Sequence, residues 1–493
     1  MDVARNVVRN LLAVLLFSLA SLAQATSPAP AQPADDDKPR INKQQAQELF
    51  RSVDDILQWV SKETGLPIKH PVKRELASRA QVQHFLEERQ KDDEDAKRLA
   101  RSELVLKKFG LIPRNFDLNK FLIQLLREQI VGFYDPKKQT VFLLDWTEPE
   151  AQRPVLAHEL THALQDQNFN LEKWQRAGMP TPEEERKAEQ ESLKSPEAER
   201  RNLQKEIAAD ELSSARQAVT EGQGMVTLFD YMLAPTGRTI TTDPAIAEAM
   251  KQSMMASNDS PVFSRAPLTL KEALTFPYRY GVGFEQTMLK RGGKELAFRK
   301  AMESPPSTTR EVMEPLRYVN HETVPEVPVF AVGNMLGADF VRFDVGAMGE
   351  FDVYLIADSW ADQEQAARFA PAWRGGYYYA ASAKPAGKHA PDPKDTAAVK
   401  LLYVSRWDSP ETARRFADFY GKSLEKRYSK VTPALALEGD APTWNTEEGP
   451  VQIATDDRLV IVTEGFEAAV AKRLRQSAQQ AANEPAQKQP AKP

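Results

Sequence analysis

The 493-residue sequence has no cysteine, only six histidines and no marked excess of either charge, since 65 lysines and arginines nearly balance 70 aspartates and glutamates. Without cysteine the chain can form neither disulfides nor thiolate metal sites, so any metal must be held by His, Asp or Glu. The balanced charge gives no electrostatic reason to expect nucleic acid or an anionic membrane as a partner. A chain of this length exceeds what one hydrophobic core usually serves, and we expect two or three domains.

Long apolar runs are also scarce, and the one candidate lies near the start of the chain. Residues 1–25 have the pattern of a secretory signal peptide, in which two arginines precede an apolar run and Ala23-Gln24-Ala25 forms a small-residue cleavage site. The run is short for a membrane span, and no later segment is long and apolar enough to be one. We therefore expect an exported protein, periplasmic or extracellular, without stable membrane insertion. Residues 26–45 and 476–493 are predicted to be a disordered linker and a disordered tail.

One stretch carries a metal-binding pattern. His158-Glu159-Leu160-Thr161-His162 matches H-E-x-x-H, which on a helix puts both imidazoles on one face, one turn apart, with the glutamate beside them. Apolar residues on both flanks of this stripe recur at helical spacing, which is typical of a buried helix. The pattern predicts a site for one zinc ion per chain, with Glu159 as its general base.

A catalytic zinc site with two histidines and a water needs one more protein ligand, and a carboxylate on a second packed helix usually supplies it. Small and apolar residues between 207 and 222 mark such a helix, and Glu221 is the preferred ligand. Its neighbours Ala218 and Gly222 are small and would let the helix approach the metal closely. Asp210 and Glu206 remain alternatives, because their offsets from Glu221 bring them near the same helical face.

The residues that flank the motif suggest two further roles. A strand at 130–134, a turn at 135–138 and a strand at 140–145 form a predicted hairpin just before the motif helix. An edge strand beside a metal can pair with an extended peptide, although the strand can equally be structural. Asp166, four residues beyond His162, is a candidate to orient that imidazole, and the alternative is a carboxylate on the helix surface.

These residues carry a family resemblance. The H-E-x-x-H motif, followed by Glu221-Gly222 on a later helix, resembles the gluzincin group of zinc metallopeptidases. The stretch from Glu128 to about Tyr318 also resembles a group of little-characterised secreted bacterial metallopeptidase-like proteins. The segments that carry this second resemblance are Gly132-Phe133-Tyr134-Asp135-Pro136, Phe276-Pro277-Tyr278-Arg279-Tyr280-Gly281 and Pro305-Pro306-Ser307-Thr308-Thr309.

The resemblance implies a reaction in which zinc, held by His158, His162 and Glu221, activates a water for attack on a peptide bond of a protein or peptide substrate. Glu159 would take the proton of that water and return it to the leaving amine. Gluzincins commonly stabilise the oxyanion with a Tyr or His from the lobe that follows the third ligand. Tyr280 is our first choice for this role; the other candidates in that lobe are Tyr278 and His321.

The order of predicted elements indicates an α+β fold. Residues 46–108 read as an N-terminal helical region, either a propeptide or a cap, and residues 327–475 as a separate C-terminal α+β domain. The resemblance implies that residues 109–326 form a zincin-like metallopeptidase domain, with a small sheet, the active-site helix and a helical lobe. In the C-terminal domain we expect strands at 351–356, 375–379 and 399–404, helices at 362–370 and from Pro410, and a hairpin of 451–454 with 459–462. Core packing is the preferred interpretation of the aromatic residues Trp373, Tyr377, Tyr379 and Trp407 over a binding surface.

Two hypotheses of function follow. The first is a secreted zinc endopeptidase. The second is a non-catalytic envelope protein with a structural or vestigial zinc site and a partner-binding C-terminal domain. Glu159 favours the first, because a purely structural site does not require a base beside its ligands.

Overall fold

The computed structural model describes residues 41–89, 93–129, 132–243, 245–246, 248–249, 252, 260–323, 327–337, 339–384, 395–434 and 441–483. The predicted signal peptide, residues 1–25, lies outside the described residues, as do residues 26–40 of the predicted linker and 484–493 of the predicted tail. None of the described helices is long and apolar enough to cross a membrane. The described strands form two sheets with helices packed around both, so the prediction of an α+β fold is confirmed.

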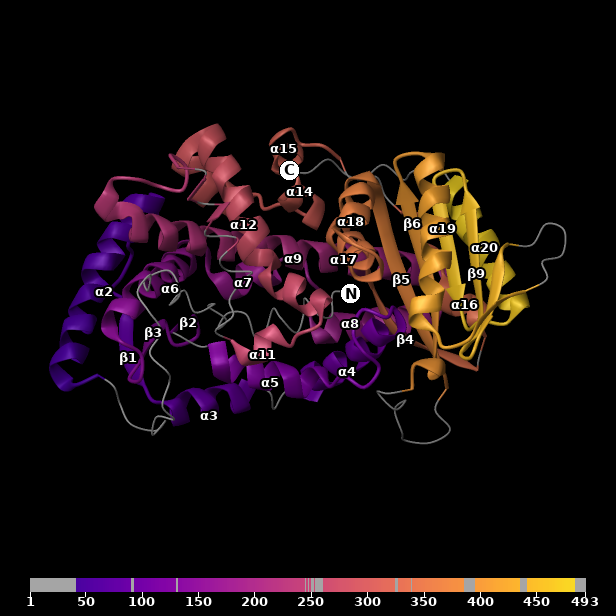
Figure 1. The fold of residues 1–493 in the computed structure, drawn as a ribbon, viewed down its shortest axis with the longest axis horizontal. Helices are drawn as coiled ribbons and strands as arrows, with labels where there is room; N and C mark the ends of the chain where they lie inside the picture. Colours follow the sequence, from indigo (N-terminus) through magenta and orange to yellow (C-terminus); the bar gives the residue numbers. More distant parts are fainter. Residues whose placement is uncertain are drawn as a thin grey trace.

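A small sheet lies at one end of the elongated molecule (Figure 1). Its strand order is β1 (Lys73–Ala77), β3 (Thr140–Leu144) and β2 (Phe133–Asp135). Strand β3 pairs in parallel with β1 and antiparallel with β2, and all its residues are buried, as expected for a central strand. The predicted hairpin is therefore confirmed for its described part, with β2 at an edge of the sheet, while residues 130–131 lie outside the described residues.

The N-terminal region differs from its prediction in two places. Helix α2 (Lys43–Thr64) begins inside the range predicted as a disordered linker, because Asn42 and Gln45 form a reciprocal cap at its start. Strand β1 interrupts the range 46–108 that was predicted to be helical. Its charged sequence gives a weak strand signal, and the strand exists through its pairing with β3. The apolar face of α2 packs against the motif helix, and β1 pairs with β3. Both α2 and β1 therefore belong to the body of the fold.

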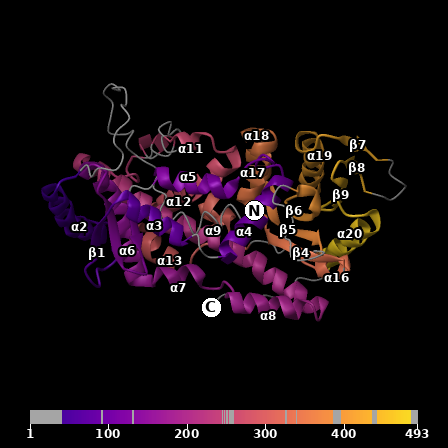
Figure 2. The same ribbon diagram turned by 90° about the horizontal axis from the view of Figure 1, so that it is seen from below.

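Three long helices lie between the two sheets, α6 (Pro149–Phe169), α9 (Pro196–Leu233) and α12 (Leu268–Lys294), and α9 packs against both of the others (Figure 2). Shorter helices complete this lobe and its surroundings. They are α3 (Arg79–Arg89), α4 (Asp93–Lys108), α5 (Leu118–Gln129), α7 (Leu171–Arg176), α8 (Pro182–Ser192), η2 (Ala234–Thr236), α11 (Pro261–Ser264), η3 (Glu295–Lys300), α13 (Ala301–Glu303), α14 (Thr309–Met313) and α15 (Pro315–Val319).

The second sheet has the order β4-β5-β6-β10-β9-β8-β7, and each neighbouring pair is antiparallel. Its strands are β4 (Phe340–Ala347), β5 (Trp373–Ala383), β6 (Val399–Trp407), β7 (Val431–Pro433), β8 (Thr443–Thr446), β9 (Gly449–Asp456) and β10 (Leu459–Glu464). The associated helices are α16 (Val332–Leu336), α17 (Glu350–Trp360), α18 (Gln363–Phe369), η4 (Ala370–Ala372), η5 (Thr396–Ala398), α19 (Pro410–Arg427) and α20 (Ala468–Asn483).

Both faces of this sheet are covered. Tyr377 and Tyr379 point to the face under α16 and α20, whereas Tyr378 points to the face under α17 and α19, which is the two-residue alternation of a strand. The predicted strands at 375–379 and 399–404, the two helices and the hairpin are confirmed. The four aromatic residues considered for a binding surface are buried, which confirms their assignment to the core.

Two predictions for this part of the chain are wrong. Residues 351–356 form helix α17 and no strand, because the helix is buried on nearly every side and so lacks the polar stripe that would mark its period. The predicted tail from 476 onward begins inside helix α20, which continues to Asn483. Leu474 and Ala478 lie one helical turn apart and are both buried, so packing on the sheet extends this helix.

Candidate metal centre

The motif helix α6 presents its two histidines to the interior of the molecule. His158 and His162 are 1% and 9% exposed, and their rings meet edge to face with centroids 4.6 Å apart. The two Nε2 atoms lie 2.9 Å from each other. The helix assignment and the common face, both predicted from spacing, are confirmed.

Helix α9 brings Glu221 to the same point. Its Oε2 atom lies 3.3 Å from Nε2 of His158 and 3.6 Å from Nε2 of His162. Zinc at ordinary bond lengths holds tetrahedral ligand atoms about 3.3 Å apart, so these three atoms have the spacing of a zinc ligand set. The His158, His162 and Glu221 group is buried and able to hold a metal ion.

The two alternative carboxylates have other partners. Glu206 pairs with Arg342 at 2.6 Å, and Asp210 accepts a hydrogen bond from the backbone N–H of Ala347. Both lie on α9 with Glu221, but a helix rises about 1.5 Å per residue. Asp210, 11 residues before Glu221, therefore lies about 16 Å from it along the helix, and Glu206, 15 residues before it, lies about 22 Å away. Sharing a helical face therefore does not bring them to the histidines.

Two glycines of α9 allow close packing around His158, His162 and Glu221. A Cβ atom on Gly224 would lie 2.7 Å from Cε1 of His158, so the imidazole occupies the space of the missing side chain. A Cβ atom on Gly222 would lie 2.5 Å from the carbonyl carbon of Gly281 in α12. Gly222 was predicted to let the helix approach the metal. It instead lets α9 and α12 cross at backbone contact, and Gly224 is the residue that admits the histidine.

The charges of the cluster are strongly coupled. Burial opposes ionisation of Glu221, but the imidazoles of His162 and His158 outweigh it and lower the pKa of this carboxylate. Burial also disfavours the charged form of His162, yet the Glu221 carboxylate raises the pKa of that imidazole. The pKa of His158 is lowered, chiefly by burial. The cluster therefore combines one carboxylate, Glu221, with one imidazole that favours the positive charge, His162, and one that disfavours it, His158.

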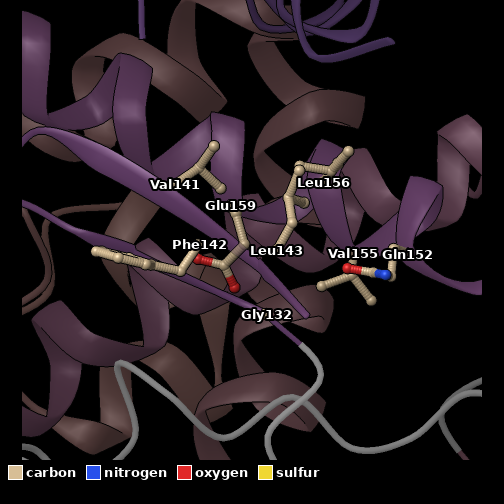
Figure 3. A pocket seen from close by; sticks show the side chains of 8 residues that line it. All are labelled: Gly132, Val141, Phe142, Leu143, Gln152, Val155, Leu156 and Glu159. Carbon is tan, nitrogen blue, oxygen red and sulfur yellow. The ribbon is translucent and has the colours of Figure 1, made fainter. Parts of the chain in front are cut away.

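Glu159 lies beside the cluster on the side of the small sheet. Its Oε2 atom accepts a hydrogen bond of 2.7 Å from the backbone N–H of Tyr134 in the edge strand β2. The carboxylate borders a narrow, largely apolar crevice between the hairpin and α6 that has no room for a water molecule (Figure 3). Burial raises the pKa of Glu159 to about 8. The group therefore exchanges its proton near neutral pH, which is the range that a general acid or base requires.

The side chain that orients His162 is Gln165. Its Oε1 atom lies 2.8 Å from Nδ1 of His162. Asp166, the residue considered for this role, accepts hydrogen bonds from the Tyr134 hydroxyl and from the backbone N–H of Leu171. Gln165 is three residues beyond His162, and side chains at this spacing are also neighbours on a helix face. The sequence-based prediction preferred a charged partner and therefore chose Asp166.

Among the candidates for the oxyanion donor, Tyr280 contacts residues outside the cluster of His158, His162 and Glu221. Its ring packs against Phe276 and Phe351, and the charged and polar groups that act on it are those of Arg279, Tyr354, Glu272 and Glu350. For Tyr278, burial and the charges of Glu221 and Glu159 raise the pKa well above its usual value. Of these two tyrosines, Tyr278 is therefore the one near the cluster of His158, His162 and Glu221, and His321 is exposed in the turn after α15.

Comparison with known families gives one match. A family model described as a domain of unknown function, DUF8575, matches residues 340–475, which include the seven strands of the second sheet. No curated protein and no solved structure matches the chain. The match does not extend to the helices that carry the metal cluster.

Proposed function

We propose that the protein is a zinc-dependent metallopeptidase of the gluzincin type. The observation that carries this proposal is the convergence of His158, His162 and Glu221 at ligand spacing, with Glu159 beside them. The small sheet, the helix α6 and the helices α9 and α12 supply the parts expected of a zincin-like domain.

The proposed reaction is hydrolysis of a peptide bond. Zinc, when bound by His158, His162 and Glu221, supplies a water of near-neutral pKa and a Lewis acid for the carbonyl group. Glu159 accepts the proton of the attacking water at one carboxylate oxygen while Tyr134 N–H holds the other, and it then passes the proton to the leaving amine. Tyr278 donates a hydrogen bond to the developing oxyanion, the role first considered for Tyr280.

The substrate would be a protein or peptide in extended form. The N–H of Tyr134 points from the edge of the small sheet toward Glu159, so this edge faces the reacting groups. An extended chain beside this edge would gain backbone hydrogen bonds to edge groups other than the Tyr134 N–H, which Glu159 occupies, without a requirement for one side-chain sequence. The signal-peptide pattern of residues 1–25 supports a reaction outside the cytoplasm, in the periplasm or beyond the cell.

A second function is favoured by one observation, the burial of the cluster. Because the three ligands are 1–9% exposed, a substrate reaches them only after the surrounding elements move. The same burial suits a structural metal in a non-catalytic envelope protein whose C-terminal domain binds a partner.

The Glu159→Gln variant separates the two functions. Gln retains an oxygen that can accept the Tyr134 N–H but cannot take a proton, so we expect zinc to stay bound at one ion per chain while cleavage of unfolded casein falls about 10²–10⁴-fold. Metal analysis and a fluorescent casein assay measure the two properties. Full activity in the variant would rule out the mechanism. Tight zinc in the native protein without cleavage of any protein would support the structural function.

A further inference from the structure

A chain of buried amide groups leads from His162 to the far side of α9. Gln165 Oε1 lies 2.8 Å from His162 Nδ1, and Gln165 Nε2 donates to Gln223 Oε1 at 2.8 Å. Gln223 Nε2 in turn donates to the backbone carbonyl of Ala297 at 2.8 Å. Both glutamines are fully buried, so water cannot replace these bonds. The chain crosses three elements, α6, α9 and η3.

The far end of the chain determines the direction of each hydrogen bond. The carbonyl of Ala297 can only accept, so Gln223 must present its NH₂ group there and its oxygen to Gln165. Gln165 must then present its NH₂ group to that oxygen, and it also donates to the carbonyl of Thr220 at 3.2 Å. Only the oxygen of Gln165 is left for His162. Two carbonyl groups, from different parts of the chain, thus impose the same orientation.

We infer that Gln165 and Gln223 are positioning residues that hold the proton of His162 on Nδ1 and leave Nε2 as the nitrogen that faces the metal. The assignment holds for the neutral and for the charged imidazole, because an amide oxygen requires a hydrogen on Nδ1 in both. A histidine that binds metal through Nε2 needs this tautomer. The inference rests on the proposed metal site, and it adds the residues that prepare one ligand before metal arrives.

The first test examines the metal-free full-length protein by ¹⁵N NMR with labelled histidine. The His162 signals are assigned by their loss in a His162→Gln variant. We expect a proton on Nδ1 of His162 that exchanges slowly with water, and we expect it to become exchangeable in Gln165→Met. A native protein with neutral His162 protonated on Nε2 alone would overturn the inference, and this result needs neither zinc nor activity.

The second test measures zinc affinity by competition with a chelator. Loss of a group that orients a histidine ligand typically weakens metal binding about 10–100-fold, and we expect this for Gln165→Met. Gln223→Met should weaken binding less, because Thr220 still orients Gln165. The matched control is Gln286→Met, which removes another buried glutamine that donates to a backbone carbonyl, that of Ile240. The control should keep native affinity.

The outcomes separate this inference from the proposed function. Equal zinc affinity in Gln165→Met and the native protein, with the Nδ1 proton retained, would overturn the role of the glutamines. Equal losses in Gln165→Met and Gln286→Met would also overturn it, because general destabilisation would then explain both. A native protein that shows the Nδ1 proton and binds zinc but cleaves no protein would leave the inference standing and remove the peptidase.

Discussion

The substitution Gly224→Ala tests the packing of α9 against His158, the first histidine of the proposed metal site. The added methyl group would lie 2.7 Å from Cε1 and 2.8 Å from Nδ1 of His158. Ordinary contacts between such atoms are about 3.5 Å or longer, so the imidazole must retreat by about 0.8 Å. Metal–ligand distances in a functional site vary by only about 0.2 Å. We therefore expect zinc affinity to fall about 100-fold, which corresponds to about 2.7 kcal/mol.

The stability of the metal-free protein should change much less. Alanine favours a helix interior over glycine by about 1 kcal/mol, and this offsets part of an overpacking cost of about 1–3 kcal/mol. Thermal unfolding should shift by a few degrees, and chelator competition should report the loss of zinc affinity. The control is Gly421→Ala in α19, where the atoms nearest to the methyl group belong to the Trp444 ring and Ile453 and lie 3.2 Å or more away. Native zinc affinity in Gly224→Ala would refute the reasoning, as would an equal loss in the control.

Three further predictions concern other residues. Tyr278→Phe should lower kcat for peptide cleavage about 10²–10³-fold with zinc affinity unchanged, while Tyr280→Phe should retain activity; the reverse result would restore the original choice. Gly222→Ala should lower the free energy of unfolding of the metal-free protein by at least about 2 kcal/mol in chemical denaturation, because its methyl group meets a backbone that cannot turn aside. Burial raises the pKa of Asp230 to about 7 in the folded state, so the free energy of unfolding should fall as pH rises from about 4 to 7. Asp230→Asn should remove that dependence and stabilise the protein by about 2–4 kcal/mol at pH 8 but not at pH 4; equal effects at both pH values would contradict the assignment.

The motif helix could be predicted because the pattern that identifies it lies within one short stretch of sequence. The spacing of His158 and His162 requires only the helical period, and flanking apolar residues identify the period within one short stretch. The identity of the proposed third ligand depends on where α9 crosses α6, which is a tertiary property. The sequence offered three carboxylates on one helix, and the crossing selects Glu221. The nearby glycines, Gly222 and Gly224, are the local mark of that crossing.

The choice between Tyr278 and Tyr280 shows where periodicity stops being informative. Side chains two positions apart on a helix, such as those of Tyr278 and Tyr280, point in directions about 200° apart. At most one of them therefore faces a given neighbour. Much of α12 is buried, and no polar stripe tells which face meets the metal ligands. Helix α17 gave a wrong strand prediction for the same reason. Its N-terminal cap, in which Asp352 accepts from the N–H of Gly349, marks it as a helix more clearly than its apolar pattern does.

The acidic residues of α9 contact different parts of the molecule along the length of the helix. In its N-terminal half, Glu199 accepts from backbone N–H groups at the start of α16, and Glu206 and Asp210 bind to β4. Glu211 accepts from the first N–H of α14, and only Glu221 reaches the histidines. About 22 Å of helix separates Glu206 from Glu221. The C-terminal sheet therefore fixes the direction of the helix that carries the third ligand, whereas the two glycines beside that ligand fix its distance from the histidines. A sequence in which one helix serves both purposes offers more candidate ligands than the proposed metal site can use, and the hydrogen-bond and ion-pair partners of each carboxylate distinguish them.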